Sequence, residues 1–146
     1  MTVVVANAPG KVVLCGEYAV LDGAPAVCMA VNRRAGARVT YADTDYHCVI
    51  APGYSDVEGR FRVSADGIDW LEGEDEYRLV DATLRTINFV PPRPLRIELD
   101  TSAFLDPATG NKIGLGSSAA LTVALLSALT AEGSGLADAI TAHRWL

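Results

Sequence analysis

The chain has 146 residues, half of them hydrophobic, and its 12 basic and 18 acidic residues give a formal net charge of -6. A chain of this length and composition can bury the core of one ordinary domain. Because the net charge is negative, the molecule lacks the broad positive field that nucleic acid or an anionic membrane surface requires. Both classes of partner are therefore excluded, and any anionic ligand must be held by local groups.

The cysteines and the apolar runs indicate a cytoplasmic protein. Cys15, Cys28 and Cys48 are odd in number and lack metal-ligand spacing, and nothing resembles a secretory signal, so we expect reduced thiols in a cytosol. His47 beside Cys48 suggests a metal only weakly, because no second ligand pair follows at a useful spacing. The longest apolar run, at about 119–129, is too short to span a bilayer.

Runs of β-branched residues separated by turn residues fill the first half of the sequence. Strands are expected near residues 3–7, 12–15 and 26–42, with turns at Pro9-Gly10 and Asp22-Gly23. The segments YHCVIAPG, GRFRVSADG and IDWLEG continue the pattern of short strands. This half of the chain is therefore predicted to form a mostly antiparallel sheet.

Helical periodicity appears in the second half. Over about 74–90, apolar residues recur at helical spacing with charged residues between them, which predicts an amphipathic helix. Pro91 and Pro92 end it, and LRIELD then alternates as a half-buried strand does. A second helix is expected at about 117–131, buried on most sides because it has little polar surface. A last helix should begin near Leu136.

The stretch NKIGLGSSAALTVALLSAL places Gly114, Gly116 and two serines directly before the second helix. A loop that holds phosphate needs converging backbone amides, and glycine permits both the backbone geometry and the close approach. If Ser117 begins the helix, the first turn offers unpaired amides and the positive end of the helix dipole. The alternative is that Ser117 is only the N-cap of a buried helix. The Lys-Ser/Thr ending of a P-loop is absent, so that motif is excluded.

A second stretch, APGKVVLCGEYAVLDGAPAV, carries Lys11 beside a Pro-Gly turn at the start of a strand. A flexible ammonium there can reach a phosphate or a nascent oxyanion. Glu17 and Tyr18 follow a glycine at the far end of that strand. Taken alone, residues of this kind are more often exposed polar side chains at a strand end.

Read together, the two stretches resemble the GHMP kinases, the family of galactokinase, homoserine, mevalonate and phosphomevalonate kinases. In that family a PGK strand with GE.AV..G is followed later in the chain by GLGSSAA. The matching residues here are 9–11, 16–20 with Gly23, and 114–120. Within the family the chain looks most like phosphomevalonate kinase, since Tyr18 stands where mevalonate kinases tend to have histidine and the lead-in to the serine loop differs.

The resemblance implies an α+β fold, namely the family's N-terminal, ATP-binding domain over residues 1–146, ribosomal-protein-like, with a two-layer antiparallel sheet and helices on one face. It also implies ATP-dependent phosphoryl transfer, with magnesium, to phosphomevalonate in the mevalonate pathway of isoprenoid biosynthesis. The alternatives are mevalonate kinase or another GHMP small-molecule kinase. An alternative of another class is a non-catalytic nucleotide-binding fragment or decayed paralogue.

The resemblance also implies roles for single residues. Lys11 would be catalytic, stabilising the transferring group or the acceptor, and Glu17 and Tyr18 would lie near the substrate. Ser118 would help to hold magnesium. The ATP phosphates would be bound by Lys112, Gly114, Leu115, Gly116, Ser117, Ser118 and Ala119.

One departure from the family is large. The family usually has a second domain and an acidic catalytic residue, placed in the phosphomevalonate branch soon after a segment similar to AHRWL. This sequence stops there, in mid-pattern and without a helix cap. We therefore expect a truncated chain that is inactive or nearly so by itself, and that is completed by a C-terminal half in cis or in trans.

Overall fold

The structure, a computed structural model, describes residues 3–64, 66–87 and 90–134. Its strands are β1 (Val3–Cys15), β2 (Val27–Tyr41), β3 (His47–Ala51), β4 (Ser55–Ser64), β5 (Gly67–Glu72) and β6 (Leu95–Asp100). The described helices are α1 (Arg78–Ile87) and α2 (Ser117–Ser134), with two short 3-10 helices, η1 (Ala19–Asp22) and η2 (Ser102–Phe104).

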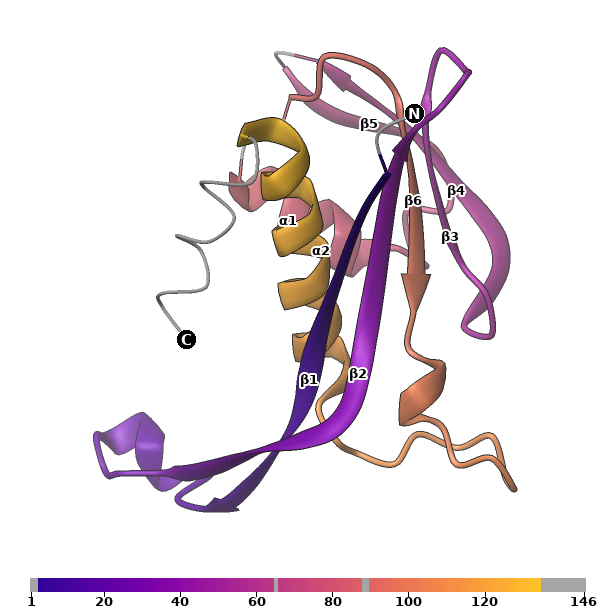
Figure 1. Cartoon of the computed structure of the whole chain (residues 1–146). Coiled ribbons are helices and arrows are strands. Elements are labelled where there is room, and N and C mark those ends of the chain that lie inside the picture. Colours follow the sequence, from indigo (N-terminus) through magenta and orange to yellow (C-terminus); the bar gives the residue numbers. More distant parts are fainter. Residues whose placement is uncertain (1–2, 65, 88–89, 135–146) are drawn as a thin grey trace.

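The strands form one sheet in the order β1-β2-β6-β3-β4-β5, and both α-helices lie on the same face of it (Figure 1). Neighbouring strands are antiparallel except β3 and β6, which run parallel. A parallel pair needs a long crossover, and here β4, β5 and α1 supply it. The predicted α+β fold with helices on one face is confirmed, with this one parallel pair added.

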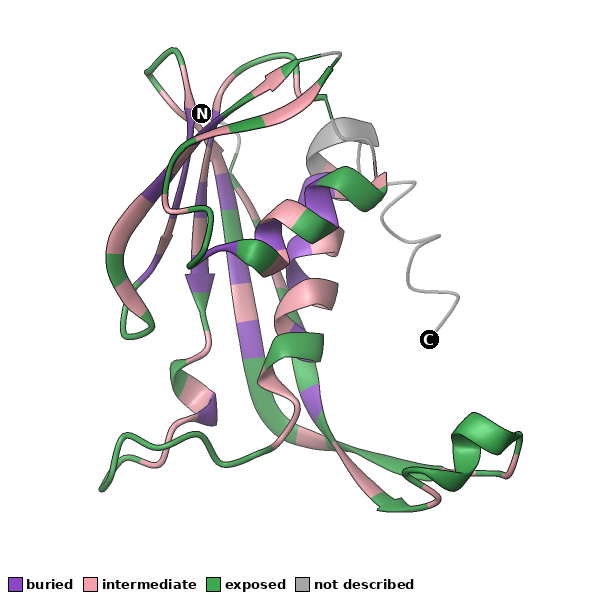
Figure 2. Cartoon of the chain, turned by 180° about the vertical axis from the view of Figure 1, so that it is seen from behind, coloured by how far each residue is buried: buried purple, intermediate pink, exposed green. Residues whose placement is uncertain are grey.

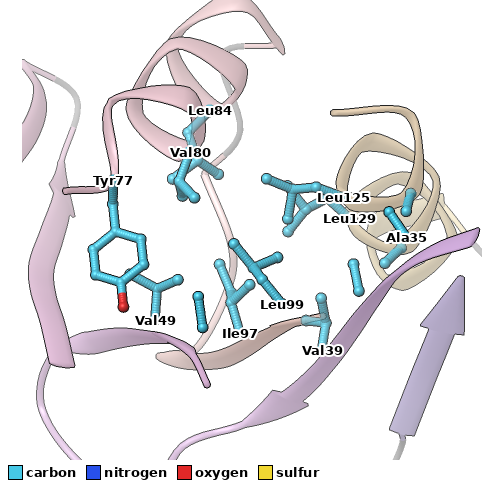
Figure 3. Close-up of a cluster of buried hydrophobic side chains, with 14 of the residues drawn as sticks. Ala35, Val39, Val49, Tyr77, Val80, Leu84, Ile97, Leu99, Leu125 and Leu129 are labelled. Carbon is cyan, nitrogen blue, oxygen red and sulfur yellow. The ribbon is translucent and has the colours of Figure 1, made fainter. Parts of the chain in front are cut away.

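The core lies between the sheet and the two helices (Figure 3). Val39 of β2 and Ile97 of β6 point into it from neighbouring strands, and both are almost fully buried. Leu125 and Leu129 from α2 and Val80 from α1 close it from the other side. Each such side chain contributes about 2 kcal/mol of hydrophobic stabilisation when it leaves water. This packing holds α2, and with it the loop at the start of the helix, against the sheet.

Helix α2 confirms the second predicted helix and continues three residues beyond the expected end. Its buried stripe includes Ala120, Ala124 and Ala128, whose small side chains let the helix approach the sheet closely. Helix α1 begins at Arg78 rather than Glu74, because the preceding residues form a hydrogen-bonded turn. The helix expected from Leu136 lies outside the described residues.

Beyond the core, β1 and β2 continue together as a long hairpin, residues 10–31, which we call the arm (Figure 1). Most of its side chains are exposed (Figure 2). They include large apolar ones such as Leu14, Tyr18 and Leu21. The arm therefore carries an apolar surface that the described residues leave uncovered.

The arm begins at an irregularity in strand pairing. Pro9 pairs with Arg34 but Gly10 pairs with Val31, so β2 has two residues at this point without a partner on β1. Such a bulge bends the ribbon. The prediction of separate strands at 3–7 and 12–15 is wrong, because β1 runs through Pro9-Gly10. The proline is tolerated since β1 is an edge strand, where a missing amide need not cost a ladder bond.

Candidate functional site

The loop before α2 has the backbone geometry that its glycines predicted. Gly114 and Gly116 both have φ of 73°, in the left-handed region that favours glycine. The Gly116 carbonyl accepts the first helical hydrogen bond, from the Ala120 amide at 3.1 Å, so Gly116 is the N-cap. The alternative in which Ser117 is the N-cap is therefore wrong.

The amides that follow form the first turn of α2. Within the described part of the chain, the amides of Ser117, Ser118 and Ala119 have no hydrogen-bond acceptor. They sit at the positive end of a helix of 18 residues. Unpaired amides with this dipole form a favourable environment for an anion.

Lys11, from the other sequence stretch of the family resemblance, lies against this loop. Its backbone amide donates a 2.9 Å hydrogen bond to the Leu115 carbonyl. Its side chain runs beside Gly116, because a Cβ placed on that glycine would lie 3.2 Å from Lys11 Cγ and 3.5 Å from Cε. The structure thus brings the exposed lysine to the loop from a different strand.

Gly10 explains how β1 comes so close. A Cβ on this residue would lie 2.5 Å from the Leu115 carbonyl oxygen and 2.5 Å from Cε1 of Phe104. Phe104 is almost fully buried under the loop. Only glycine fits at this position, so the PG dipeptide before Lys11 is a close-packing element as well as a bend.

A cavity of about 270 Å³ opens beside the start of α2. Ser117, Ser118, Lys112 and Tyr54 line it, together with the residues around the start of α1. The Lys112 ammonium lies 5.3 Å from the centroid of the Tyr54 ring, a cation–π arrangement at the rim. The structure therefore brings Lys112 to the same cavity as the two serines.

A tight turn presents Lys112. Asp106 accepts hydrogen bonds from the Ala108 and Thr109 amides through one carboxylate oxygen, and its own amide donates to the Asn111 carbonyl. Lys112 then bridges to Leu105 as an isolated antiparallel pair. These bonds hold the loop in a defined shape without a core of its own.

Tyr77 forms part of the cavity wall and fixes it to β4. Its hydroxyl donates to the Val57 carbonyl at 2.7 Å, and burial raises the pKa of this phenol. The ring packs on Gly59, where a Cβ would lie 2.6 Å from Tyr77 Cδ2. No functional role was predicted for residues 44–99, so the sequence interpretation missed this wall. Its only sequence signal was the pair of glycines at Gly59 and Gly73.

Glu17 and Tyr18 are not brought to the cavity. They lie beyond β1 on the arm, both are exposed, and neither lines the cavity. Tyr18 is 80% exposed. They belong to the connection between β1 and β2, whereas Lys11 meets the loop at the base of the arm. Any contact they make with a substrate must be on that part of the molecule.

His47 and Cys48 are structural. The buried imidazole accepts a hydrogen bond from the Leu95 amide at Nδ1 and stacks on Phe61. Cys48 lies beside Arg96, and burial raises the pKa of its thiol. Among the described residues, no cluster of three or more His, Cys, Asp or Glu side chains is arranged to hold a metal. In the same part of the chain, no helix is long and apolar enough to cross a membrane.

Comparison with known proteins identifies homologues. No family model matches the chain. A mevalonate kinase from Methanothermobacter thermautotrophicus is 33% identical over 124 residues, covering 85% of this chain and 35% of that protein. A phosphomevalonate kinase from Streptomyces sp. is 33% identical over 143 residues, covering 88% of this chain and 38% of that protein. This chain is a homologue of the GHMP kinases. It spans between 35% and 40% of the length of the curated relatives.

Solved structures show that this homologue has the fold of one part of those kinases. Streptococcus pneumoniae phosphomevalonate kinase, in complex with phosphomevalonate and AMPPNP, aligns with a TM-score of 0.64 at 21% identity. The alignment covers 91% of this chain and 37% of that one. Methanococcus jannaschii mevalonate kinase aligns with a TM-score of 0.60 at 20% identity, over 92% of this chain and 41% of that one. At such identities the likeness shows the fold alone.

Proposed function

We propose that this chain is the nucleotide-binding part of a small-molecule kinase that transfers the γ-phosphoryl group of ATP to phosphomevalonate. The observation that carries the proposal is the contact of Lys11 with Gly116, directly beside the unpaired first-turn amides of α2. Amide dipoles and a lysine on one spot suit a polyphosphate chain. The names of the curated relatives supply the acceptor class, mevalonate or phosphomevalonate.

The residues present fit ATP and magnesium. Ser118 lines the cavity, and its hydroxyl has no hydrogen-bond partner within the described part of the chain. Magnesium in nucleotide sites usually takes one or two protein oxygens and fills its other positions with phosphate and water. We assign Ser118 as that protein ligand and Lys112 as the charge at the rim. Bound ATP supplies the phosphoryl group, and the chain's own residues bind and orient it.

The cavity beside the serines is the place that we assign to the nucleoside. It continues from the start of α2 toward Tyr54 and Tyr77, so a chain of phosphates on the loop leads into it. The aromatic side chains offer a surface for a planar base. Its volume of about 270 Å³ lies just below the range of roughly 300–1,000 Å³ that is typical of small-molecule sites.

Transfer to phosphomevalonate needs little help from a general base. A phosphate monoester has a second pKa near 6, so it is largely deprotonated at neutral pH. Neutralising charge as the phosphoryl group moves is then the main task. We assign this task to Lys11, and in the complete enzyme its loss should cost on the order of 3 kcal/mol of transition-state stabilisation. Glu17 and Tyr18 are assigned to the acceptor end, on the arm.

By itself the chain is expected to turn over slowly or not at all. No residue of it is assigned as the acidic catalytic group, and the apolar side chains on the arm need a covering partner. We assign that cover to a further polypeptide, in cis or in trans. A coupled ATP-consumption assay on the 146-residue chain with phosphomevalonate should stay well below about 1 per second, the low end for kinases.

Calorimetric titration with AMPPNP and magnesium tests the proposed function. The chain should bind, and Ser118→Ala should weaken binding about tenfold or more, since a metal ligand is lost. The matched control is Ser102→Ala, an exposed serine on η2 outside the cavity. Equal affinity for all three proteins, or no binding by any, would contradict the assignment.

An activity assay on the protein completed by its C-terminal half separates the alternatives. Nucleotide binding without activity in that protein would favour the non-catalytic module. Comparing phosphomevalonate with mevalonate in that protein identifies the acceptor.

A further inference from the structure

We propose that Arg33 is a positioning residue that braces the arm against the loop before α2. Its guanidinium donates from Nη1 to the Ala103 carbonyl at 3.0 Å, across 70 residues of sequence. Arg33 is one of the two β2 residues left without a partner on β1 at the point where the arm begins. The inference rests on the proposed function only for the claim that the loop binds phosphate. The brace itself is a property of the fold.

The short helix η2 links the arm to the loop. It receives Arg33 from β2 at the Ala103 carbonyl. The next residue, Phe104, fills the space beside Gly10 of β1, and its carbonyl accepts the Ile113 amide at 3.0 Å. Gly10 at the base of the arm, Arg33 of β2 just outside the arm, and the start of the loop therefore all meet at η2. A shift of η2 would therefore move β1, β2 and the loop.

The phosphate side of the site depends on the same junction. Two residues after Ile113, the Leu115 carbonyl accepts the Lys11 amide, and Lys11 in turn packs on Gly116. The distance between the lysine and the first turn of α2 is thus set by how the arm sits on η2. Arg33 supplies the side-chain tie at that point. Its place in the bulge leaves it free of the ladder with β1, so its side chain can serve this contact.

The chain offers a matched control in the next residue. Arg34 is also exposed and carries the same charge, but in the described part of the chain its side chain has no hydrogen bond or ion pair. Arg33→Met and Arg34→Met therefore change charge and hydrophobicity equally. Only the first removes the bond to Ala103.

Backbone hydrogen exchange of the 146-residue chain measures the brace directly. In Arg33→Met the Lys11 and Ile113 amides should exchange about tenfold faster, the size of effect expected when a charged hydrogen bond is lost near a local opening. Amides of the central sheet, such as Val39, should not change, which shows that the variant is folded. Arg33→Lys keeps a donor and should recover most of the protection. Arg34→Met should match the parent chain.

A second readout separates positioning from general stability. Inorganic tripolyphosphate should bind Arg33→Met about tenfold more weakly than it binds Arg34→Met, at unchanged melting temperature. Equal exchange at Lys11 in the two variants would overturn the brace. Equal tripolyphosphate affinity would overturn its positioning role. Failure of the parent chain to bind tripolyphosphate would contradict the proposed function, and the exchange result would then decide the brace alone.

Discussion

Lys11 and Gly116 are in contact although β1 and the loop before α2 are far apart in the sequence. A Cβ on Gly116 would stand 3.2 Å from Lys11 Cγ, and the glycine has φ of 73°. The backbone conformation favours glycine here, and a side chain at this position would also crowd the lysine beside it.

Gly116→Ala should disturb nucleotide binding more than it disturbs the fold. The new methyl group strains the backbone and displaces Lys11, so AMPPNP affinity should fall at least tenfold, while the free energy of unfolding falls by about 1–2 kcal/mol. Gly110→Ala is the control, because its φ is 70° and a Cβ there meets nothing within 4 Å. Similar losses of affinity in both variants would show that the contact with Lys11 has no role.

Gly59→Ala tests the wall of the cavity. The added carbon would lie 2.6 Å from Tyr77 Cδ2 and 2.7 Å from Val49 Cγ1, so either the ring or the strand must move. Overpacking of this kind costs about 1–3 kcal/mol of unfolding free energy. Urea denaturation measures that cost, and titration with AMPPNP measures the accompanying loss of affinity. Unchanged affinity despite the lower stability would place the nucleoside elsewhere.

His47 should make stability depend on pH in a defined window. Burial lowers the pKa of this imidazole from 6.5 to about 4, so the folded chain keeps it neutral where the unfolded chain protonates it. Its contribution to stability is complete above pH 6.5 and is lost as the pH falls toward 4. The free energy of unfolding should fall by about 3 kcal/mol over that window.

The control for this pH effect is His47→Asn. An asparagine oxygen can accept the Leu95 amide in place of Nδ1, but it does not titrate. Urea denaturation gives the free energy of unfolding of both proteins at each pH. The difference between the two values isolates the contribution of the histidine from that of other groups. A difference that stays constant between pH 7 and 4 would show that His47 is not held neutral.

Asp81 ties α1 to β5. Both oxygens of its carboxylate share the hydrogen bond donated by Arg85 Nε, and one of them also accepts from the Trp70 indole. These bonds, with that of Arg85 first, lower the pKa of Asp81. Asp81→Asn should lower the free energy of unfolding by about 1 kcal/mol and shift the Trp70 fluorescence. Asp75→Asn, in the fully exposed pair with Arg78, should have no measurable effect. Equal effects in the two variants would contradict the tie.

Local patterns were enough to predict the loop and its helix. Glycines at 114 and 116 permit the left-handed backbone found there, and the apolar run after them favours a buried helix, so both could be predicted from nearby residues. The pairing of Lys11 with this loop was inferred only by resemblance to a family, because its cause is tertiary. It needs Gly10 to pack on Phe104, and no local pattern shows that contact.

Features that depend on distant segments were missed. The cavity wall needs the β3–β4 turn at Tyr54 to face the start of α1, which depends on how β3 pairs in parallel with β6. Pro9-Gly10 was expected to end a strand, but the two extra residues of β2 absorb the irregularity and β1 continues. Turn propensity is a local preference, and pairing within the sheet overrides it.

Amide chemical-shift mapping of the ¹⁵N-labelled chain tests the central claim most directly. On titration with AMPPNP and magnesium, the account predicts the largest shifts at the amides of Ser117, Ser118 and Ala119, together with Lys11, and little change at the far end of β4 and β5. Shifts absent from these amides, or confined to another part of the sheet, would contradict it.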